Sequence, residues 1–306
     1  MSTAWKTAAA YEASKCPGCQ TARGETIFRE TWEGVPMEIV VCAKCGLGYS
    51  NPRPTEASKL ARYEEWSQRE RPNASEAHYD HSQQLRHFHL YRKVMRLVEA
   101  RMERGLLLDV GCAGGLFVVF AGVYASEHNS GVNSRYTAEG AAFDPREAEL
   151  AKRISGAPVH LISELAGLPA GRYDAITMLN VLEHVNEPVE LLGELRRLLR
   201  AGGALIVVSP NNELAFARLR MGIGARPTSL AAGEHINHFR PASLRRMLER
   251  AGFSKMDLVA AQPTGSYGSM VRPPLGQYVK HGVYLALHTL TASRCYLYSE
   301  LIAVAE

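Results

Sequence analysis

The stretch Leu106–Phe117, LLLDVGCAGGLF, joins an apolar run to an acid and then passes directly into a glycine-rich turn. Leu106–Leu108 is typical of a buried strand in a parallel sheet. Gly111, Gly114 and Gly115 allow the backbone to turn tightly and to approach a ligand closely. A strand followed by such a turn and then by a helix is an arrangement that binds nucleotides. The stretch therefore predicts an α/β fold with a nucleotide-type site.

The glycine spacing distinguishes this loop from the dinucleotide-binding type. Position 113 is alanine and no glycine follows Gly115 by three residues, so the GxGxxG pattern is absent. DVGCAGG instead resembles motif I of the class I S-adenosylmethionine (SAM) methyltransferases, (D/E)xGxGxG, in which the position of Ala113 is more often glycine. A methyl group there disfavours a positive φ. The resemblance implies that SAM is bordered by Asp109, Gly111, Cys112, Ala113 and Gly115.

A cofactor that carries a ribose needs a carboxylate at the tip of the second strand, and Asp144 in EGAAFDP fits this role. It follows Asp109 by 35 residues, whereas about 20 are expected. The excess lies in Gly122–Thr137, a polar segment without periodicity, which we interpret as an inserted loop. The loop is either a lid over the site or a surface insertion.

Two later blocks extend the resemblance. YDAITMLNVLEHVNEP begins at Tyr173 and resembles the family's "VLEHv.dP" block, and LLRAGGALIVVSPN begins at Leu198 and resembles "LLkpGGlliistPn". They predict strands over Tyr173–Val181 and Ala204–Ser209, with a helix over Val189–Arg200 between them. The resemblance implies a role beside the methionine end of SAM and its methyl group for Leu179, Asn180 and Glu183. It implies a structural or SAM-side role for His184.

The resemblance covers roughly Tyr91–Glu306 and implies a Rossmann-like, doubly wound sheet of seven strands in the order 3-2-1-4-5-7-6, with the last strand antiparallel. SELIAVA at the C-terminal end is the expected seventh strand. The long connection Gln262–Ser299 before it is either a second cover over the substrate or a packing segment.

Four cysteines form two CxxC pairs, Cys16/Cys19 and Cys42/Cys45, with 22 residues between the pairs. The spacing is typical of a zinc ribbon, in which two knuckles present four thiolates to one tetrahedral metal. A disulfide or a thioredoxin-like redox pair is disfavoured, because no secretory-signal pattern precedes Cys16 and no βαβ pattern surrounds either pair. Four thiolates leave no open coordination position, so we expect a structural Zn²⁺.

The block CAKCGLGYSNPRP resembles a zinc-binding segment that precedes the methyltransferase domain in bacterial enzymes of polysaccharide and natural-product clusters. The resulting division is a zinc-ribbon-like segment (1–52), a helical connector (53–89) leading into a helix over Leu90–Arg104, and a methyltransferase domain (90–306). The histidine-rich run HYDHSQQLRHFH in the connector lacks carboxylate or cysteine partners at fixed spacing, which disfavours a second metal site.

The composition supports one α/β domain with a small accessory module, since 46% of the 306 residues are hydrophobic and the net charge is +4. The arginine clusters fall on expected amphipathic helices, where a solvated charged face is the default. The sequence shows neither a bilayer-length apolar run nor a signal-peptide pattern, so we expect a cytoplasmic protein without membrane association. The oligomeric state is not indicated.

These features favour a SAM-dependent methyltransferase that acts on a small molecule such as a sugar nucleotide, a polyketide or an aromatic intermediate, with an oxygen acceptor slightly favoured. His235 and His238 of GEHINHF are the candidate general bases. One alternative is an RNA methyltransferase, but the ribbon lacks interleaved aromatic and basic residues and the strand-four tip has NVLE in place of (N/D)PP(Y/F). Nucleic acid is therefore the less favoured partner. The other alternative is a SAM-binding scaffold without catalysis.

Overall fold

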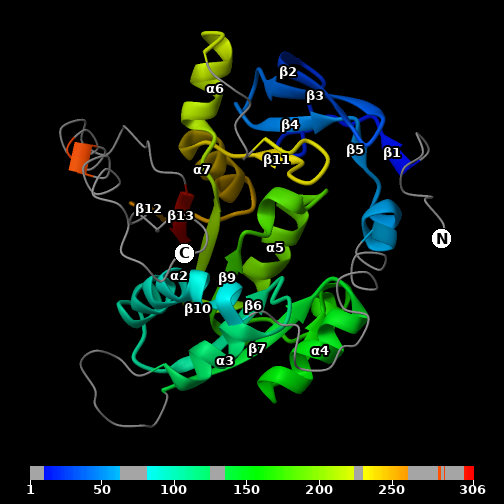
Figure 1. Cartoon of the computed structure of the whole chain (residues 1–306). Helices are drawn as coiled ribbons and strands as arrows, with labels where there is room; N and C mark the ends of the chain where they lie inside the picture. The colour runs from blue at the N-terminus through cyan, green and yellow to red at the C-terminus, as the bar shows by residue number, and fades with distance from the viewer. Residues whose placement is uncertain are drawn as a thin grey trace.

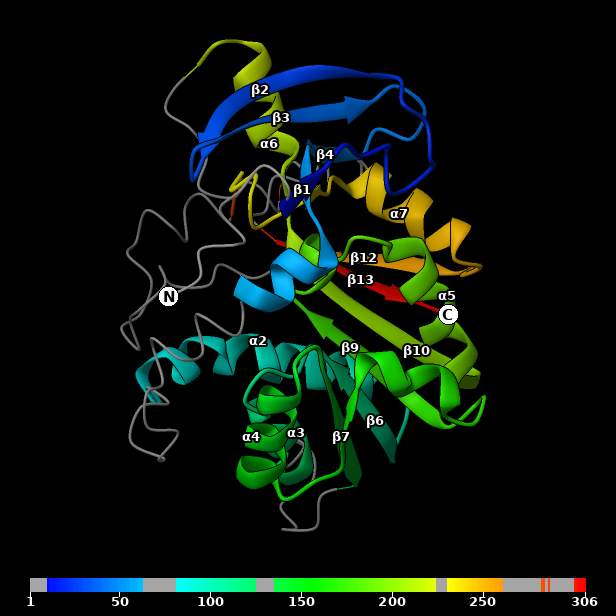
Figure 2. The same cartoon turned by 90° about the vertical axis from the view of Figure 1, so that its right-hand side faces the viewer.

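The computed structural model describes residues 10–62, 81–124, 135–223, 230–260, 282–283, 286 and 300–306. A seven-stranded sheet forms the centre of the molecule, and a smaller sheet lies above it (Figures 1 and 2). The central strands are β6 (Gly105–Val110), β7 (Tyr136–Ala142), β8 (Val159–Leu161), β9 (Tyr173–Leu179), β10 (Leu199–Pro210), β12 (Met256–Ala260) and β13 (Glu300–Ala305).

The strand order β12-β13-β10-β9-β6-β7-β8 confirms the predicted order 3-2-1-4-5-7-6. Strands β8, β7, β6, β9 and β10 are parallel, and β13 is antiparallel to both of its neighbours. Because the five parallel strands share one direction, their carboxyl ends meet at one edge of the sheet. In such a sheet this edge is where ligands bind.

Helices cover both faces of the sheet. They are α2 (His81–Glu99), α3 (Leu116–Val123), α4 (Pro145–Ser155), α5 (Pro188–Leu198) and α7 (Pro241–Arg250), with short 3-10 helices η4 (Ile162–Gly167) and η5 (Leu182–His184). Helix α6 (Glu213–Arg220) packs instead against the smaller sheet. Buried side chains of α2, α3 and α4 share one core with the sheet, and those of α5 and α7 share another. The alternation of parallel strands and helices is what requires two apolar layers.

The structure changes some predicted boundaries. The helix before the first strand begins at His81 rather than Leu90 and ends at Glu99, so the predicted division at residues 89/90 falls inside α2. Of the predicted insertion, residues 125–134 lie outside the described residues, while α3 ends at Val123 and β7 begins at Tyr136. The predicted cover at 262–299 also lies outside them, except for 282–283 and 286.

The smaller sheet has the order β11-β4-β3-β2 and contains β2 (Gly24–Trp32), β3 (Val35–Cys42), β4 (Gly48–Asn51) and β11 (Asn237–His238). A separate two-stranded sheet pairs β1 (Tyr11–Glu12) with β5 (Arg53–Pro54). Strands β2 and β3 connect the two cysteine pairs and are antiparallel to each other. Strand β11 follows the central strand β10 along the chain, so the cysteine-bearing module (residues 16–51) shares a sheet with the part of the chain that builds the central sheet.

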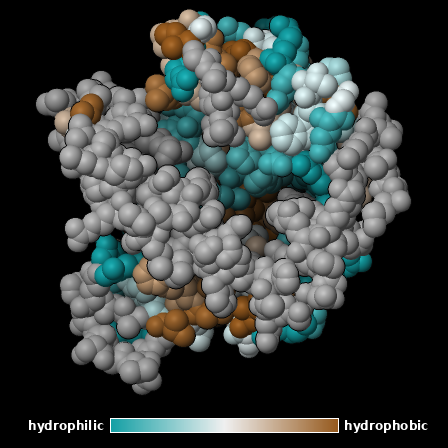
Figure 3. Space-filling view, viewed as in Figure 1, coloured by the Kyte–Doolittle hydropathy of each residue, from teal (hydrophilic) through white to brown (hydrophobic). Residues whose placement is uncertain are grey.

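The surface of the face seen in Figure 1 is hydrophilic over the middle of the molecule and hydrophobic over α6 and around α3 (Figure 3). Leu214, Met221 and Ile223 are 40%, 61% and 54% exposed in and just after α6. Among the described residues, no helix combines the length and the apolar character needed to cross a membrane.

Candidate active site

The glycine-rich loop between β6 and α3 has the backbone conformation that the motif requires. Gly111, Ala113 and Gly115 have φ angles of 73°, 46° and 79°. A Cβ atom at Gly111 would lie 2.4 Å from Val181 Cγ2, so glycine is required there for space as well as for conformation. Ala113 adopts a positive φ although its methyl group disfavours this conformation, at a cost of about 1–2 kcal/mol. The loop keeps its shape despite the missing glycine.

Asp109 lies in β6, two residues before Gly111, and is 4% exposed. Its carboxylate accepts a hydrogen bond from Thr177 Oγ1 at 2.7 Å, and burial raises the pKa of Asp109 to about 7. The described contact of this side chain joins β6 to β9, and its contact with SAM stays a prediction.

Asp144 follows β7 by two residues, at the same edge of the sheet as the glycine-rich loop. Its Oδ1 accepts hydrogen bonds from the backbone N–H groups of Arg146 (2.7 Å) and Glu147 (3.2 Å), which caps α4. The other oxygen, Oδ2, forms no hydrogen bond with another described residue, so capping the helix and binding a ribose hydroxyl are compatible.

The tip of β9 brings a second acidic group to this edge. Leu179 ends the strand, and Asn180 takes a φ of 56° while its N–H donates to Val208 O at 2.9 Å. Glu183 is 1% exposed, and its Oε2 accepts a hydrogen bond from Ser209 Oγ at 3.0 Å. Its other oxygen, Oε1, has no partner among the described residues, and burial raises the pKa of Glu183 to about 7.

Two histidines from distant segments meet beside Glu183. The rings of His184 and His235 are 4.9 Å apart in an edge-to-face arrangement. His184 Nδ1 lies 2.8 Å from Glu234 O, and because a carbonyl only accepts, Nδ1 carries the proton and Nε2 keeps a lone pair. Burial lowers the pKa of His184 to about 4. The acceptor atoms of Glu183, His184 and His235 lie within 4.8 Å of one another, so the group can move a proton or hold a cation.

His238 lies outside this group. It is fully buried in β11, where it pairs with Gly48 of β4. Its Nε2 is 3.3 Å from Ser50 Oγ, and burial lowers the pKa of His238 to about 3. A neutral imidazole enclosed on all sides has no route to a substrate proton. Of the two predicted bases, His235 lies beside Glu183 and His184, and His238 does not.

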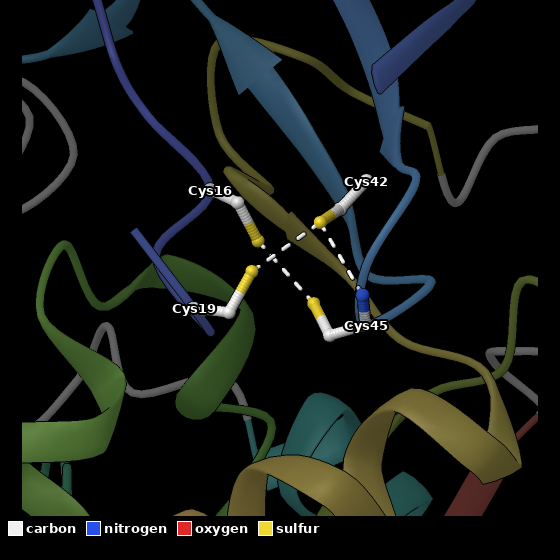
Figure 4. A group of neighbouring side chains, drawn as sticks. All are labelled: Cys16, Cys19, Cys42 and Cys45. Carbon is white, nitrogen blue, oxygen red and sulfur yellow. Dashed lines mark hydrogen bonds between the residues drawn. The ribbon is translucent and has the colours of Figure 1, made fainter. Parts of the chain in front are cut away.

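The four cysteines converge on one point from two loops (Figure 4). Cys16 Sγ and Cys45 Sγ are 3.4 Å apart, as are Cys19 Sγ and Cys42 Sγ, and none of the four forms a disulfide. The Cys45 N–H donates to Cys42 Sγ at 3.4 Å. Four buried, unbridged sulfur atoms with no competing charged side chain among them fit a tetrahedral thiolate site of the kind that holds Zn²⁺.

Several residues with contacts to the site carry no signal in the sequence. Ser209 contacts Glu183, Thr177 contacts Asp109, and the partly buried Lys59 donates from Nζ to His184 O at 2.9 Å. Serine, threonine and lysine are common at any surface. Only their position in the folded chain distinguishes these three.

The chain aligns with several solved structures. A SAM-dependent methyltransferase from Archaeoglobus fulgidus aligns over 79% of this chain and 98% of its own length, with 14% identity and a TM-score of 0.45. A TehB-like SAM-dependent methyltransferase from Corynebacterium glutamicum aligns over 80% and 97%, with 16% identity and a TM-score of 0.41.

The curated relatives are closer in sequence. A ubiquinone biosynthesis O-methyltransferase of Xanthomonas axonopodis pv. citri is 31% identical over 174 residues, which span 54% of this chain and 70% of the relative. The enzyme of the same name from Aromatoleum aromaticum is 28% identical over 158 residues, or 50% and 65% of the two lengths. The family model described as a methyltransferase domain matches residues 79–258, more than half of the chain. The chain therefore belongs to the methyltransferase domain family and is a SAM-dependent methyltransferase.

Proposed function

We propose that this protein transfers the methyl group of SAM to a hydroxyl oxygen of a small molecule, and that His235 accepts the proton of that hydroxyl. The observation that carries the proposal is the convergence of Glu183, His184 and His235 at the carboxyl end of β9, next to the glycine-rich loop. A neutral imidazole at this edge is a suitable general base.

Bound SAM supplies an electrophilic methyl group on a positively charged sulfur. The residues Gly111–Gly115 let the backbone approach the cofactor, and Asp144 offers an oxygen to the ribose hydroxyls. Methyl transfer is an in-line displacement, so the remaining task is to hold the acceptor oxygen in line and to remove its proton. His235 does the second.

The proposed acceptor class rests on the relatives, which are named as O-methyltransferases of ubiquinone biosynthesis. An aromatic hydroxyl is therefore the first acceptor to test, ahead of sugar nucleotides and polyketide intermediates. The four cysteines are proposed to hold a structural Zn²⁺, which takes no part in the chemistry because all four positions are thiolates.

The test of the proposed function is a methyl-transfer assay with labelled SAM and a panel of acceptors: catechols, sugar nucleotides, polyketide mimics and transfer RNA. We expect label in a small-molecule hydroxyl product together with S-adenosylhomocysteine. Label in RNA alone would replace the proposal with the RNA alternative. SAM binding without transfer to any class would favour the scaffold.

The ribose contact predicts the effect of Asp144→Asn on cofactor affinity. The amide keeps an oxygen that can cap α4 but loses the charge, and a hydrogen bond to a charged group is worth about 1.5–3 kcal/mol. We expect SAM affinity to fall about tenfold to a hundredfold in isothermal calorimetry. Asp144→Ser is the matched control for the cap. Serine also caps helices, but its shorter side chain does not reach as far toward the ribose. Unchanged affinity in Asp144→Asn would place the ribose elsewhere.

The buried carboxyl of Glu183 predicts a pH dependence of stability. Its pKa is raised from 4.5 to about 7 in the folded protein, so between these values the native state binds more protons than the unfolded state, and stability falls as pH rises. The stability of wild type relative to Glu183→Gln should fall by on the order of 3 kcal/mol from pH 4.5 to 7. Denaturant unfolding at several pH values measures this difference. The exposed Glu249→Gln variant should show the same pH dependence of stability as wild type. The same pH dependence in Glu183→Gln would contradict the prediction.

A further inference from the structure

The segment that carries His235 is held on two sides by backbone hydrogen bonds. The Ile236 N–H donates to Glu183 O at 2.9 Å, and Ile236 O accepts from the Ser50 N–H at 3.0 Å. Ser50 belongs to β4, and β4 lies in the cysteine-bearing sheet. A single residue, Ile236, thus bridges the tip of β9 and the cysteine-bearing module.

Ser50 adds a side-chain contact at the same place. It is 1% exposed, and its Oγ donates to His235 O at 3.2 Å. The hydroxyl has one proton, so the contact with His238 Nε2 at 3.3 Å requires the imidazole to donate to Oγ. His238 therefore serves as a buried donor that orients the hydroxyl of Ser50, and the hydroxyl in turn fixes the carbonyl of His235.

Strand β11 transmits the same constraint to the other members of the site. Asn237 pairs with Tyr49 of β4, and its Nδ2 donates to Leu182 O at 3.1 Å and to Val185 O at 2.7 Å. These two carbonyls flank Glu183 and His184. The position of β4 thus sets where η5 and the His235 segment lie relative to each other.

Strand β4 is itself fixed to the second cysteine pair. The Cys42 N–H donates to Leu47 O at 2.9 Å, one residue before β4 begins at Gly48. Gly48 is packed so closely that a Cβ atom would lie 2.3 Å from the Phe216 ring. Helix α7 holds the same loop, because Arg240 Nη2 and Arg246 Nη1 donate to Gly46 O and Cys45 O at 2.9 and 3.0 Å. Such packing leaves β4 little freedom to shift independently of the cysteines.

We propose that β4, through Ser50, is the positioning element for His235, so that the four-cysteine module sets the geometry of the acceptor side of the active site. The expected effect on activity rests on the proposed role of His235, but the coupling between β4 and the His235 segment does not. Ser50 touches neither SAM nor acceptor and acts only through the backbone of residues 235 and 236.

The first experiment compares Ser50→Ala with Thr26→Ala. Each removes one hydroxyl from the same sheet. Ser50→Ala loses the contacts with His235 O and His238 Nε2, whereas Thr26→Ala loses a hydrogen bond to Glu38 on β3, away from the site. We expect kcat of Ser50→Ala to fall about tenfold to a hundredfold, with altered pH dependence, because small displacements of a catalytic group have effects of this size. SAM affinity and bound zinc should stay unchanged. Equal kcat and pH profiles in the two variants would overturn the proposal.

The second experiment does not use activity and remains available if Ser50→Ala does not fold. Imidazole NMR signals of the wild-type protein are recorded before and after zinc is withdrawn by a chelator. We expect the signals of His235 and His238 to shift while that of His160, which contacts Glu139 in the central sheet at 2.9 Å, stays in place. An unchanged His235 signal would refute the coupling. Full turnover in His235→Ala, by contrast, would refute the proposed role of His235 as the base and leave the coupling intact.

Discussion

His235→Ala should lower kcat by about 100-fold to 10,000-fold, the range that general-base catalysis contributes. The dissociation constant of SAM should stay near that of wild type, because the residues proposed to bind it lie in the loop after β6, at Asp144 and at the tip of β9. Steady-state kinetics and calorimetry measure the two quantities separately. Added imidazole should restore part of the lost rate in the cavity that the shorter side chain leaves.

His160→Gln is the control, since His160 lies on β8 and contacts Glu139 rather than the site. It should keep kcat close to wild type. Normal turnover in His235→Ala would show that another base serves or that positioning suffices. A wild-type rate that depends on added Mg²⁺ or Mn²⁺, and that is lost in His235→Ala, would make His235 a cation ligand, since Glu183, His184 and His235 have compatible positions.

Loss of the metal should have the second large effect. We expect about one Zn²⁺ per chain by elemental analysis and almost none in Cys42→Ser, because a structural site needs all four thiolates. Binding at such sites supplies a free energy of order 10 kcal/mol that is linked to folding, so unfolding temperature should fall steeply. Cys295→Ser, outside the two CxxC pairs, should retain the metal. A metal-free protein with unchanged unfolding temperature would contradict the prediction.

The structure indicates which parts of the site the loss of the metal should disturb. All four cysteines share a hydrophobic core with Phe239, Met247 and Leu248 of the catalytic part. The glycine-rich loop is held instead by β6, β7 and α4. We therefore expect Cys42→Ser to disturb the acceptor side of the site and to leave SAM binding measurable, which calorimetry at a temperature below the transition can establish.

The central sheet could be predicted from the sequence because its determinants are local. The glycine loop at Gly111, the helix ends and the apolar strands each lie within a short stretch, and their order along the chain matches one topology. Ala113 shows the limit of that reasoning. Its positive φ follows from hydrogen bonds of the loop, such as Gly111 and Cys112 N–H to Ala141 O at 2.8 and 3.1 Å, which override the residue's own preference.

The roles of His235 and His238 could not be separated from the sequence because the deciding contacts are distant along the chain. His238 is buried by β4, and Ser50 and His238 are 188 residues apart. A one-dimensional pattern holds no information on such a pairing. The two histidines stand three residues apart in the same motif, yet the short strand β11 directs one into the interior and leaves the other beside Glu183.

The antiparallel strand β13 has a consequence for biosynthesis. Among the described strands, β12 is hydrogen-bonded to β13 alone, and β13 begins at Glu300, well after β12 ends at Ala260. During translation, β12 therefore lacks this partner until the residues from Glu300 onward have left the ribosome. Exposed strand edges of a nascent chain favour aggregation. Slow translation or truncation between these two strands should therefore increase the demand for chaperones far more than a pause before β12.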